Sequence, residues 1–359
     1  FRYMAEAGMN PILVNADRGS SWRNIGGGRT AFSLPELAEI AAQNHHIFKE
    51  LQYLSNIDYK PIRYISFAHD EETYKTLEAS KAWSKAEMIA PKQFREEISP
   101  YFNANPKKYI SALVSEDCWQ ATPGKVVDLV RNLGIAAGGT VMEDCRVLEA
   151  CREGKYTSVL VQTHDKKYVE YRTEHFVNAL GSGAGKLCDS MGIDAGLYPV
   201  RHQAFITRRL PMLGKHGTNL DMLIDRQDYK GFSAVYGQQI AYTGQIIGCA
   251  SPKLDAMRID KNLKVNTKAF LEIVSEMFSE WIPDLAGVGI QAVWAGYYTE
   301  PRYIVDPELG LFVGMRGHGF MLSQYIARMY VDKLLGRPVP EYFEKLKLNG
   351  PGLSEKAFK

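Results

Sequence analysis

The sequence of 359 residues lacks the cysteine patterns of several specialised classes. Its five cysteines (Cys118, Cys145, Cys151, Cys188 and Cys249) contain no CxxC pair and no metal-ligand spacing. This pattern excludes a zinc ribbon and a disulfide framework as the basis of the fold. An odd, scattered set of cysteines is typical of buried thiols in a reducing compartment, so we expect a cytoplasmic location and no metal site.

Long apolar runs and a strong net charge are also missing. No apolar run approaches the length of a transmembrane helix, and no signal peptide is visible. The formal net charge of +2 argues against nucleic acid or an anionic membrane as the main partner. With 45% hydrophobic and 23% charged residues, the composition is that of an ordinary globular protein with room for two domains.

The sequence does contain alternating strand and helix patterns, which predict an α/β fold. Helices are predicted at 1–8, 35–54, 71–85, 123–134 and 267–281, and strands at 12–15 and 62–68. Three runs at 139–142, 146–150 and 158–163 predict a small β-meander, followed by a central strand at 172–179 and a helix ending at 191. The stretch 198–248 is β-rich and predicts one antiparallel sheet from the runs 198–208, 221–224 and 232–236.

The most informative segment runs from Leu311 to Met321. It predicts a short strand, a turn containing Gly317-His318-Gly319, and an amphipathic helix ending near Leu335. Unpaired N–H groups at a helix start, with the positive end of the helix dipole, suit an anion or an electron-rich ring oxygen. The alternative is an ordinary strand-to-helix crossover that needs glycine for steric reasons alone. Spacing by itself leaves both interpretations open.

Four segments in register carry a resemblance to a known family. They are GSSWRNIGGGR at 19–29, FVNALGSG at 176–183, YYTEPRYIVD at 297–306 and GMRGHGF at 314–320. Together they resemble the glycine oxidase/D-amino-acid oxidase family of FAD-dependent amine oxidoreductases, which includes sarcosine oxidases and dye-linked proline dehydrogenases. The resemblance covers nearly the whole chain. It implies a Rossmann-like FAD-binding domain with an inserted antiparallel β-sheet substrate domain.

The resemblance also implies a division of the chain. We expect a discontinuous FAD-binding domain (1–60, 121–199 and 286–345), a substrate domain (61–120 and 200–285) and a C-terminal tail (346–359). Members of the family open with a strand and a Gly-x-Gly-x-x-Gly turn that binds the FAD pyrophosphate. The sequence opens inside what resembles the helix after that turn, so roughly 20–30 residues of this unit are expected to be missing from it.

The cofactor contacts follow from the matching positions. Asn15 ends the first strand, where dinucleotide folds place an acid on the ribose, and Asp17 is the alternative. The remaining positions expected to contact FAD are Ala16, Ser20, Ser21, Arg23, Asn24, Gly27, Gly28, Val147, Asn178, Ala179, Gly181, Gly317, His318, Gly319, Phe320 and Met321. Relatives that attach flavin covalently use a histidine where this chain has Arg23, or a cysteine where it has Gly296. We therefore expect noncovalent FAD.

The residues expected to act on the substrate are less well defined. Arg29 aligns with a family arginine near the flavin, although a surface salt bridge is an equally good interpretation. Two positions that hold the substrate carboxylate in several relatives are Phe32 and Met321 here, which departs from the family pattern. Replacement candidates for catalysis or substrate binding are Tyr236, Tyr298, Arg302, Arg316 and His318, and each of these has a structural alternative.

The resulting expectation is FAD-dependent oxidation of an amino or imino acid, with hydride transfer to flavin N5 and with L-proline or an N-methyl amino acid as substrate. A dehydrogenase is slightly favoured over an oxidase, because no lysine over the flavin is placed with certainty; Lys230 and Lys253 are the candidates. The electron acceptor is oxygen, a quinone or a partner subunit, and an oligomer is compatible with the sequence. Two alternatives remain: a noncatalytic flavin-binding subunit, or oxidation of a hydroxy acid or polyol phosphate.

Overall fold

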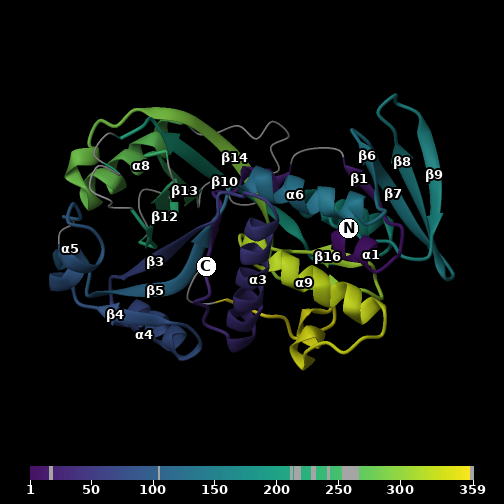
Figure 1. Ribbon diagram of the computed structural model, residues 1–359, viewed down its shortest axis with the longest axis horizontal. Coiled ribbons are helices and arrows are strands. Elements are labelled where there is room, and N and C mark those ends of the chain that lie inside the picture. The colour runs from purple at the N-terminus through teal and green to yellow at the C-terminus, as the bar shows by residue number, and fades with distance from the viewer. Residues whose placement is uncertain are drawn as a thin grey trace. The chain divides into compact units, whose positions relative to one another are not determined.

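The computed structural model describes residues 1–15, 19–103, 106–210, 213, 220–227, 232–240, 243–252 and 267–355. The chain divides into two compact units, which we call unit 1 and unit 2 (Figure 1). Unit 1 consists of residues 1–22, 124–199 and 297–353, and unit 2 of residues 23–123, 200–296 and 354–359. Residues 23–60, expected to belong to a FAD-binding domain, thus fall in the same unit as the expected substrate domain.

Unit 2 contains most of a sheet whose strands follow the order β14, β10, β13, β12, β11, β3, β5 and β2, with β4 paired to β5. Neighbours β10, β13, β12 and β11 are antiparallel, as the sequence predicts, and β11 then pairs in parallel with β3. The strands are β2 (Gly27–Gly28), β3 (Lys60–Ala68), β4 (Ala86–Ile89), β5 (Ser111–Gln120), β10 (Tyr198–Thr207), β11 (Met222–Asp225), β12 (Phe232–Gln239), β13 (Ile246–Pro252) and β14 (Ile290–Glu300).

Helix α8 (Thr267–Trp281) covers one face of this sheet (Figure 1). Its apolar side chains meet those of every second strand residue and form a single buried core. Helix members of this core are Phe270, Val274, Met277, Phe278 and Trp281, and sheet members include Phe205, Leu223, Val235 and Ala250. Because strand side chains alternate between faces, the residues next to these sheet members point to the opposite face.

The other helices of unit 2 are α3 (Pro35–Leu54), α4 (Glu71–Ala79) and α5 (Phe94–Glu97). The bounds predicted for the helices at 35–54 and 267–281 agree with the structure. The helix predicted at 71–85 is shorter: α4 ends at Ala79, and a 3-10 turn (Ser80–Trp83) follows. Further 3-10 turns lie at Pro91–Gln93, Pro106–Lys108 and Pro283–Leu285.

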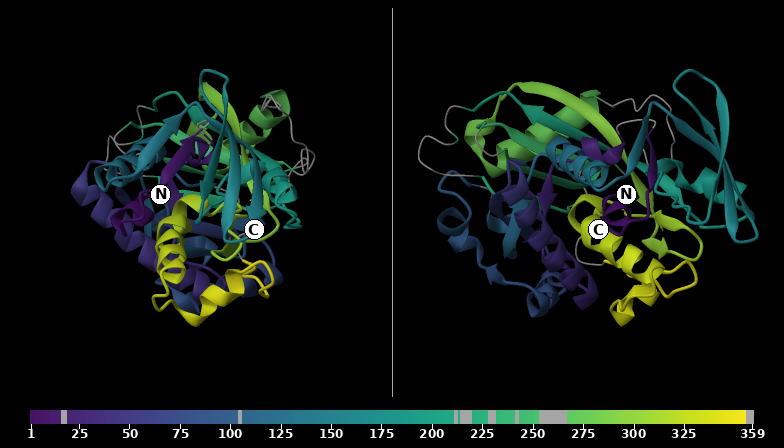
Figure 2. Two further views of the ribbon diagram at one scale, coloured as in Figure 1. Left: turned by 90° about the vertical axis from the view of Figure 1, so that its right-hand side faces the viewer. Right: turned by 45° about the vertical axis from the view of Figure 1, so that its right-hand side comes forward.

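Unit 1 has a parallel pair, β1 (Ile12–Asn15) with β6 (Thr140–Glu143), and a short antiparallel pair, β15 (Ile304–Asp306) with β16 (Leu311–Val313). Its helices are α1 (Arg2–Glu6), α2 (Ser20–Arg23), α6 (Pro123–Ala136), α7 (Ala184–Ser190) and α9 (Gly319–Leu334), with 3-10 turns at Gly181–Gly183 and Glu341–Leu346. Helix α1 packs against α9 (Figure 2).

Two strand predictions in unit 1 are wrong. The meander consists of β7 (Arg146–Glu153), β8 (Tyr156–Gln162) and β9 (Tyr168–Thr173), which form a long antiparallel ribbon (Figure 2). The first predicted run is not part of it, because β6 pairs with β1 instead. The predicted central strand at 172–179 is also absent: β9 ends at Thr173, and only Asn178 makes an isolated bridge, to Leu311.

Among the described residues, no helix combines the length and apolar character needed to cross a membrane.

Candidate active site

Three contacts within unit 1 involve the four motif segments: two join one segment to another, and the one at Asn178 reaches the strand just before the fourth segment. The Ser20 hydroxyl donates to the Tyr297 carbonyl over 2.7 Å and accepts the Tyr297 N–H over 3.2 Å. Asn178 donates its N–H to the Gly310 carbonyl over 2.8 Å and accepts the N–H of Phe312 over 2.9 Å. The third contact lies between the Gly-His-Gly turn and Tyr298. Segments separated by more than 250 residues in sequence therefore meet in one place.

The Gly-His-Gly turn presses against the ring of Tyr298. A Cβ atom added to Gly317 would lie 2.4 Å from the ring, so no larger residue fits without displacing Tyr298. Helix α9 begins directly after this turn, and no side chain caps its N-terminus. The first N–H groups of an α-helix have no partner within the helix. The Met321 N–H, by contrast, donates to the His318 carbonyl over 3.1 Å. Phe320 lies in the first turn of α9.

The His318 side chain is held by a neighbour from the Tyr-Thr segment. Its Nδ1 lies 2.5 Å from the hydroxyl of Tyr303, and both side chains are buried. This bond fixes the imidazole ring, and the backbone of the turn with it. The His318 side chain therefore helps to hold the turn in place. Its expected contact with the cofactor stays a prediction.

At the end of β1, Asn15 lies opposite Glu143 of β6 in the parallel pair. The Asn15 amide donates to the Glu143 carboxylate over 2.9 Å, and Arg131 approaches the same carboxylate at 2.5 Å. Dinucleotide folds place an acid at the end of such a strand. Here the carboxylate comes from the neighbouring strand, and sequence reasoning missed it because the β1–β6 pairing is not local. The alternatives Ala16 and Asp17 lie outside the described residues.

Asn178 organises the second motif. It is fully buried, its amide N–H donates to the Ala184 carbonyl over 3.0 Å, and its side-chain oxygen accepts the Leu180 N–H over 3.3 Å. These bonds hold the turn into α7. The exposed Ala179 and Gly181 follow, and Gly181 has a φ of +56° with no heavy atom within 4 Å of an added Cβ.

Two of the predicted substrate anchors have structural partners. Arg302 donates to the carbonyls of Leu348 and, over 3.1 Å, Gly350, so it holds the C-terminal segment in place. Arg316 forms a 2.7 Å ion pair with Glu300. Both guanidinium groups therefore support the fold of unit 1. Val147 lies in β7 opposite Val161 and packs into a small apolar cluster, which fits its expected backbone contact and an ordinary core position equally well.

In unit 2, packing alone accounts for the glycines of the first motif. A Cβ at Gly27 would lie 2.1 Å from the Tyr64 hydroxyl, and one at Gly28 would lie 2.2 Å from the Trp119 ring. The Asn24 side chain accepts the Gly26 N–H over 2.8 Å, and the Arg23 carbonyl accepts the indole N–H of Trp294 over 2.7 Å. Ser21 lies in α2 on the exposed surface of unit 1.

Arg29 is buried, with 3% of its surface exposed, so the surface salt-bridge interpretation is wrong. Its guanidinium lies 4.1 Å from the centre of the Phe32 ring, and its Nε donates to the Ala31 carbonyl over 3.2 Å. Phe32 is itself fully buried. A cation stacked on an aromatic ring retains its charge in a buried place.

On the side opposite α8, the sheet of unit 2 carries a buried cluster of Ile62, Tyr64, Cys118 and Met222, against which Ile224 and Tyr236 pack. Tyr236 is paired with Ile224 on one side and Cys249 on the other. Burial raises the pKa of the Cys249 thiol to about 12, and Tyr236 hydrogen-bonds that thiol. Burial also lowers the pKa of His202, in β10, to about 3. The candidate lysines Lys230 and Lys253 lie outside the described residues.

The described residues contain no cluster of three or more side chains able to hold a metal ion. The two adjacent histidines, His45 and His46, differ in burial. His45 is buried and stacks on Trp119 at a centroid distance of 4.5 Å, whereas His46 is exposed.

Solved structures with the same fold include three enzymes named for amino or imino acids. L-proline dehydrogenase from P. horikoshii is 22% identical, with a TM-score of 0.78 over 97% of this chain and 93% of that one. Glycine oxidase from Geobacillus kaustophilus is 16% identical, with a TM-score of 0.78 over 97% and 94%. Iminodiacetate oxidase from Chelativorans sp. BNC1 is 13% identical, with a TM-score of 0.75 over 98% and 96%.

These similarities confirm the expected α/β fold with a Rossmann-like FAD-binding part. No curated protein sequence matches the chain. The sequence model described as "DAO: FAD dependent oxidoreductase" matches residues 1–333, which is most of the chain. The meeting of the four motifs in unit 1 agrees with this match. The chain therefore belongs to the DAO family of FAD-dependent oxidoreductases, whose members are flavoproteins.

Proposed function

We propose that the protein oxidises the C–N bond of an amino or imino acid, with L-proline or an N-methyl amino acid as the preferred substrate class. The observation that carries this proposal is the contact of the third motif with both the first and the fourth in unit 1, with the second motif hydrogen-bonded to the strand just before the fourth. The solved structures of the same fold that are named for proline, glycine and iminodiacetate support the choice of substrate class.

The residues present fit FAD on two observations. Helix α9 has 16 residues and no side-chain cap, so its first N–H groups suit an electron-rich ring oxygen. Beside it, the Tyr298 ring fills the space that a Cβ on Gly317 would need, so the third motif packs directly against this turn. The N–H groups of Gly319 and Phe320 would hold the ring. Glu143 or Asn15 would hold the ribose, and the absence of the family's covalent attachment residues supports a noncovalent cofactor.

FAD supplies the acceptor for the hydride that leaves the carbon next to the substrate nitrogen. The protein's own part is to bind the substrate in its neutral amine form, orient that carbon–hydrogen bond and exclude water. The residues that surround the substrate need not act as strong acids or bases, because the flavin takes up the hydride.

The natural electron acceptor belongs to this proposal too. We favour a dehydrogenase that passes electrons to a dye, quinone or partner subunit over an oxidase.

A cytoplasmic setting is supported by the five cysteines, all of which are free thiols. The competing proposals are a noncatalytic flavin-binding subunit and an oxidase of hydroxy acids.

An anaerobic visible spectrum of the purified full-length protein tests these proposals. We expect flavin bands that bleach on addition of L-proline or an N-methyl amino acid. Bleaching by a hydroxy acid but by no amine would replace the proposed substrate class. Flavin that no substrate bleaches would favour the noncatalytic subunit.

A further inference from the structure

Unit 1 contains a polar cavity that the proposed oxidation does not use. Its volume is about 170 Å³, and its walls come from the β7–β8 pair, the segment 174–176, the β15–β16 turn and helix α9. An engineered protein cavity of about 150 Å³ holds a molecule of benzene. The cavity of unit 1 therefore has room for a ligand of similar size.

The cavity lies far along α9 from the Gly-His-Gly turn. Helix α9 begins at Gly319, directly after the turn, whereas the cavity is lined by Tyr330 and Leu334 in the second half of the helix. An α-helix rises by about 1.5 Å per residue, so these two residues lie roughly 16 and 22 Å along the axis from Gly319. The cavity is therefore a separate place from the candidate active site.

Two buried hydroxyl groups belong to the cavity wall. They are those of Thr157 and Tyr330, and each of these residues has 3% of its surface exposed. Neither hydroxyl has a hydrogen-bond partner in the part of the chain that the structure describes. Leaving a buried hydroxyl without a hydrogen bond costs free energy. A polar ligand in the cavity would supply the missing partner to both groups.

Arg152 brings a positive charge to the same wall. It lies directly opposite Thr157 in the β7–β8 pair, and its guanidinium donates to the backbone carbonyl of Glu308. Within the described ranges of the chain, no carboxylate pairs with Arg152. The residue is exposed on its outer side, but the bond to the carbonyl holds the guanidinium at the cavity. An arginine has five N–H donors, so several remain for a ligand.

The two acids that line the cavity are paired with lysines. Glu174 pairs with Lys155 at 3.1 Å, and Glu308 pairs with Lys347 at 2.8 Å. Their side chains are 56% and 74% exposed, so water and salt screen both carboxylates. His175, which also lines the cavity, is neutral or positive at any pH. An anion in the cavity therefore meets little repulsion from these groups.

A third acid, Asp306, is buried and bonded to the backbone of the β15–β16 turn. Its carboxylate accepts the N–H of Glu308 over 3.1 Å and that of Leu309 over 3.2 Å. Burial first, and then the charge of Asp306, raise the pKa of Tyr330, while Arg152 opposes this shift. The Tyr330 hydroxyl therefore keeps its proton at neutral pH and serves as a hydrogen-bond donor.

We infer that this cavity binds a small oxyanion, a carboxylate or a phosphate, between Arg152 and the hydroxyl groups of Thr157 and Tyr330. The guanidinium fork matches two oxygens of such an anion in parallel hydrogen bonds. The two hydroxyls donate to the same oxygens or to the next one, which satisfies them in turn. The site is additional to the proposed oxidation and does not depend on it.

Calorimetric titration of the purified holoenzyme tests the inference. Bound FAD occupies its own phosphate-binding groups, so added anions report on other places. The probes are inorganic phosphate, malonate and malonamide, the last of which is the uncharged analogue of malonate. We expect phosphate or malonate to bind and malonamide to bind at least 10-fold more weakly. The tighter of the two anions identifies the ligand as a phosphate or a carboxylate.

Three variants test the residues of the wall. Arg152→Met should weaken anion binding about 10- to 100-fold, the range for hydrogen bonds to a charged group. Tyr330→Phe and Thr157→Val each remove one hydroxyl at nearly constant shape. Each of them should weaken binding about 3- to 10-fold. None of the three should change the rate at which an amine bleaches the flavin.

Arg172→Met is the matched control, because its loss removes the same charge from the same ribbon. Arg172 is exposed and lies opposite Ser158 in the β8–β9 pair, one position along from Thr157. Since side chains alternate along a strand, Arg172 points to the face away from the cavity. We expect Arg172→Met to bind the anion as the wild type does.

Three results would overturn the inference. They are failure of both anions to bind the wild type, unchanged binding in Arg152→Met, and equal weakening by Arg152→Met and Arg172→Met. Thermal unfolding shows whether each variant folds. Tyr330→Phe, which keeps the aromatic ring in place, decides the question if Arg152→Met does not fold.

Discussion

At the scale of single residues, Gly317 illustrates a position where only one side chain fits. The Tyr298 side chain occupies the space that a Cβ would need, with two ring atoms at 2.4 and 2.7 Å and the hydroxyl oxygen at 3.0 Å. Because Tyr298 and Gly317 belong to two different motifs, their contact aligns the Tyr-Thr segment with the start of α9. Gly183 is different, since the nearest atom to its Cβ would be 3.7 Å away.

We expect Gly317→Ala to destabilise the protein by about 1–3 kcal/mol, the usual cost of overpacking. The ring of Tyr298 must move, and the α9 N-terminus moves with it, so FAD content should fall as well. Thermal unfolding and the ratio of flavin to protein absorbance measure both effects. Gly183→Ala should behave as the wild type. A Gly317→Ala protein with normal flavin content and stability would contradict the proposed use of this turn.

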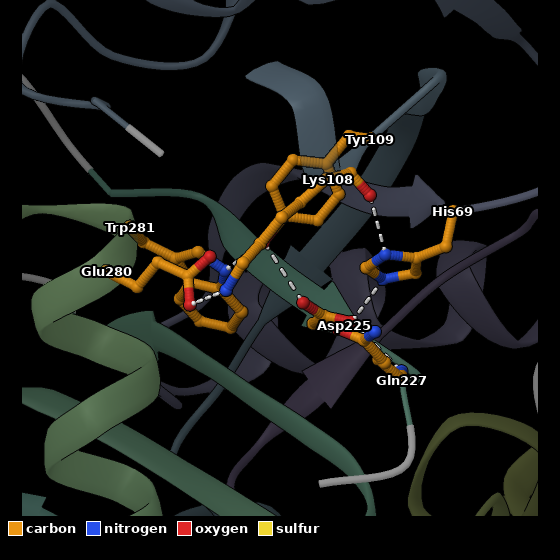
Figure 3. A network of polar contacts seen from close by, with 7 residues as sticks. All are labelled: His69, Lys108, Tyr109, Asp225, Gln227, Glu280 and Trp281. Atoms are coloured by element: carbon orange, nitrogen blue, oxygen red, sulfur yellow. Dashed lines mark hydrogen bonds and ion pairs between the residues drawn. The ribbon is translucent and has the colours of Figure 1, made fainter. Parts of the chain in front are cut away.

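At the scale of elements, a network of polar contacts around the buried Asp225 joins the ends of β3 and β11 with the start of β5 and the end of α8 (Figure 3). His69 lies between two acceptors, with Nδ1 2.9 Å from the Lys108 carbonyl and Nε2 2.6 Å from Asp225. A neutral imidazole has one N–H, so only the imidazolium donates to both. Burial lowers the pKa of His69, but the hydrogen bond and charge of Asp225 outweigh it, and the net shift is upward.

The upward shift of the His69 pKa determines how the free energy of unfolding changes with pH. A histidine whose pKa is raised on folding stabilises fully below its unfolded pKa of about 6.5, and the effect is lost as the pH rises through the folded pKa. We therefore expect His69→Gln to lower the free energy of unfolding more at pH 6 than at pH 9, measured with urea. His46→Gln, an exposed histidine of the same unit, is the control. A loss that is equal at both pH values would argue against an imidazolium at residue 69.

At the scale of the whole molecule, the buried histidines of unit 2 make it sensitive to acid. Burial, with the charge of Lys49, lowers the pKa of His45 to about 4, and burial lowers that of His202 to about 3. His45 stacks on Trp119 and lies 2.7 Å from the Tyr59 hydroxyl, so α3 and β5 are joined through a neutral ring. Protonation would place a charge inside this stack.

In the unfolded chain, His45 and His202 become protonated below about pH 6.5. In the folded protein, they stay neutral until the pH falls to about 4. Stability should therefore fall with pH between 6.5 and 4, at roughly 1 kcal/mol per pH unit or more. Urea denaturation at pH 7, 6 and 5 measures this slope. His45→Phe should flatten it and His46→Phe should not. A slope unchanged by His45→Phe would assign the acid sensitivity to other groups.

The helices and short strands were largely predictable from the sequence. The bounds at 35–54, 267–281 and 12–15 agree with the structure because period, proline and glycine signals act within a few residues. The region 139–179 was harder. Its strand runs were recognised, but the pairing of β6 with β1 and the end of β9 depend on partners far away in the sequence.

The sequence alone determined the family, the order of the motifs and the alternation of elements, since these are properties of local pattern. Only the tertiary structure shows which of the candidate polar groups have partners within the protein. Arg302 and Arg316 were plausible anchors by sequence, and each also has a partner that folding brings to it. Long-range pairing is set by burial of whole sheet faces, which no short segment encodes.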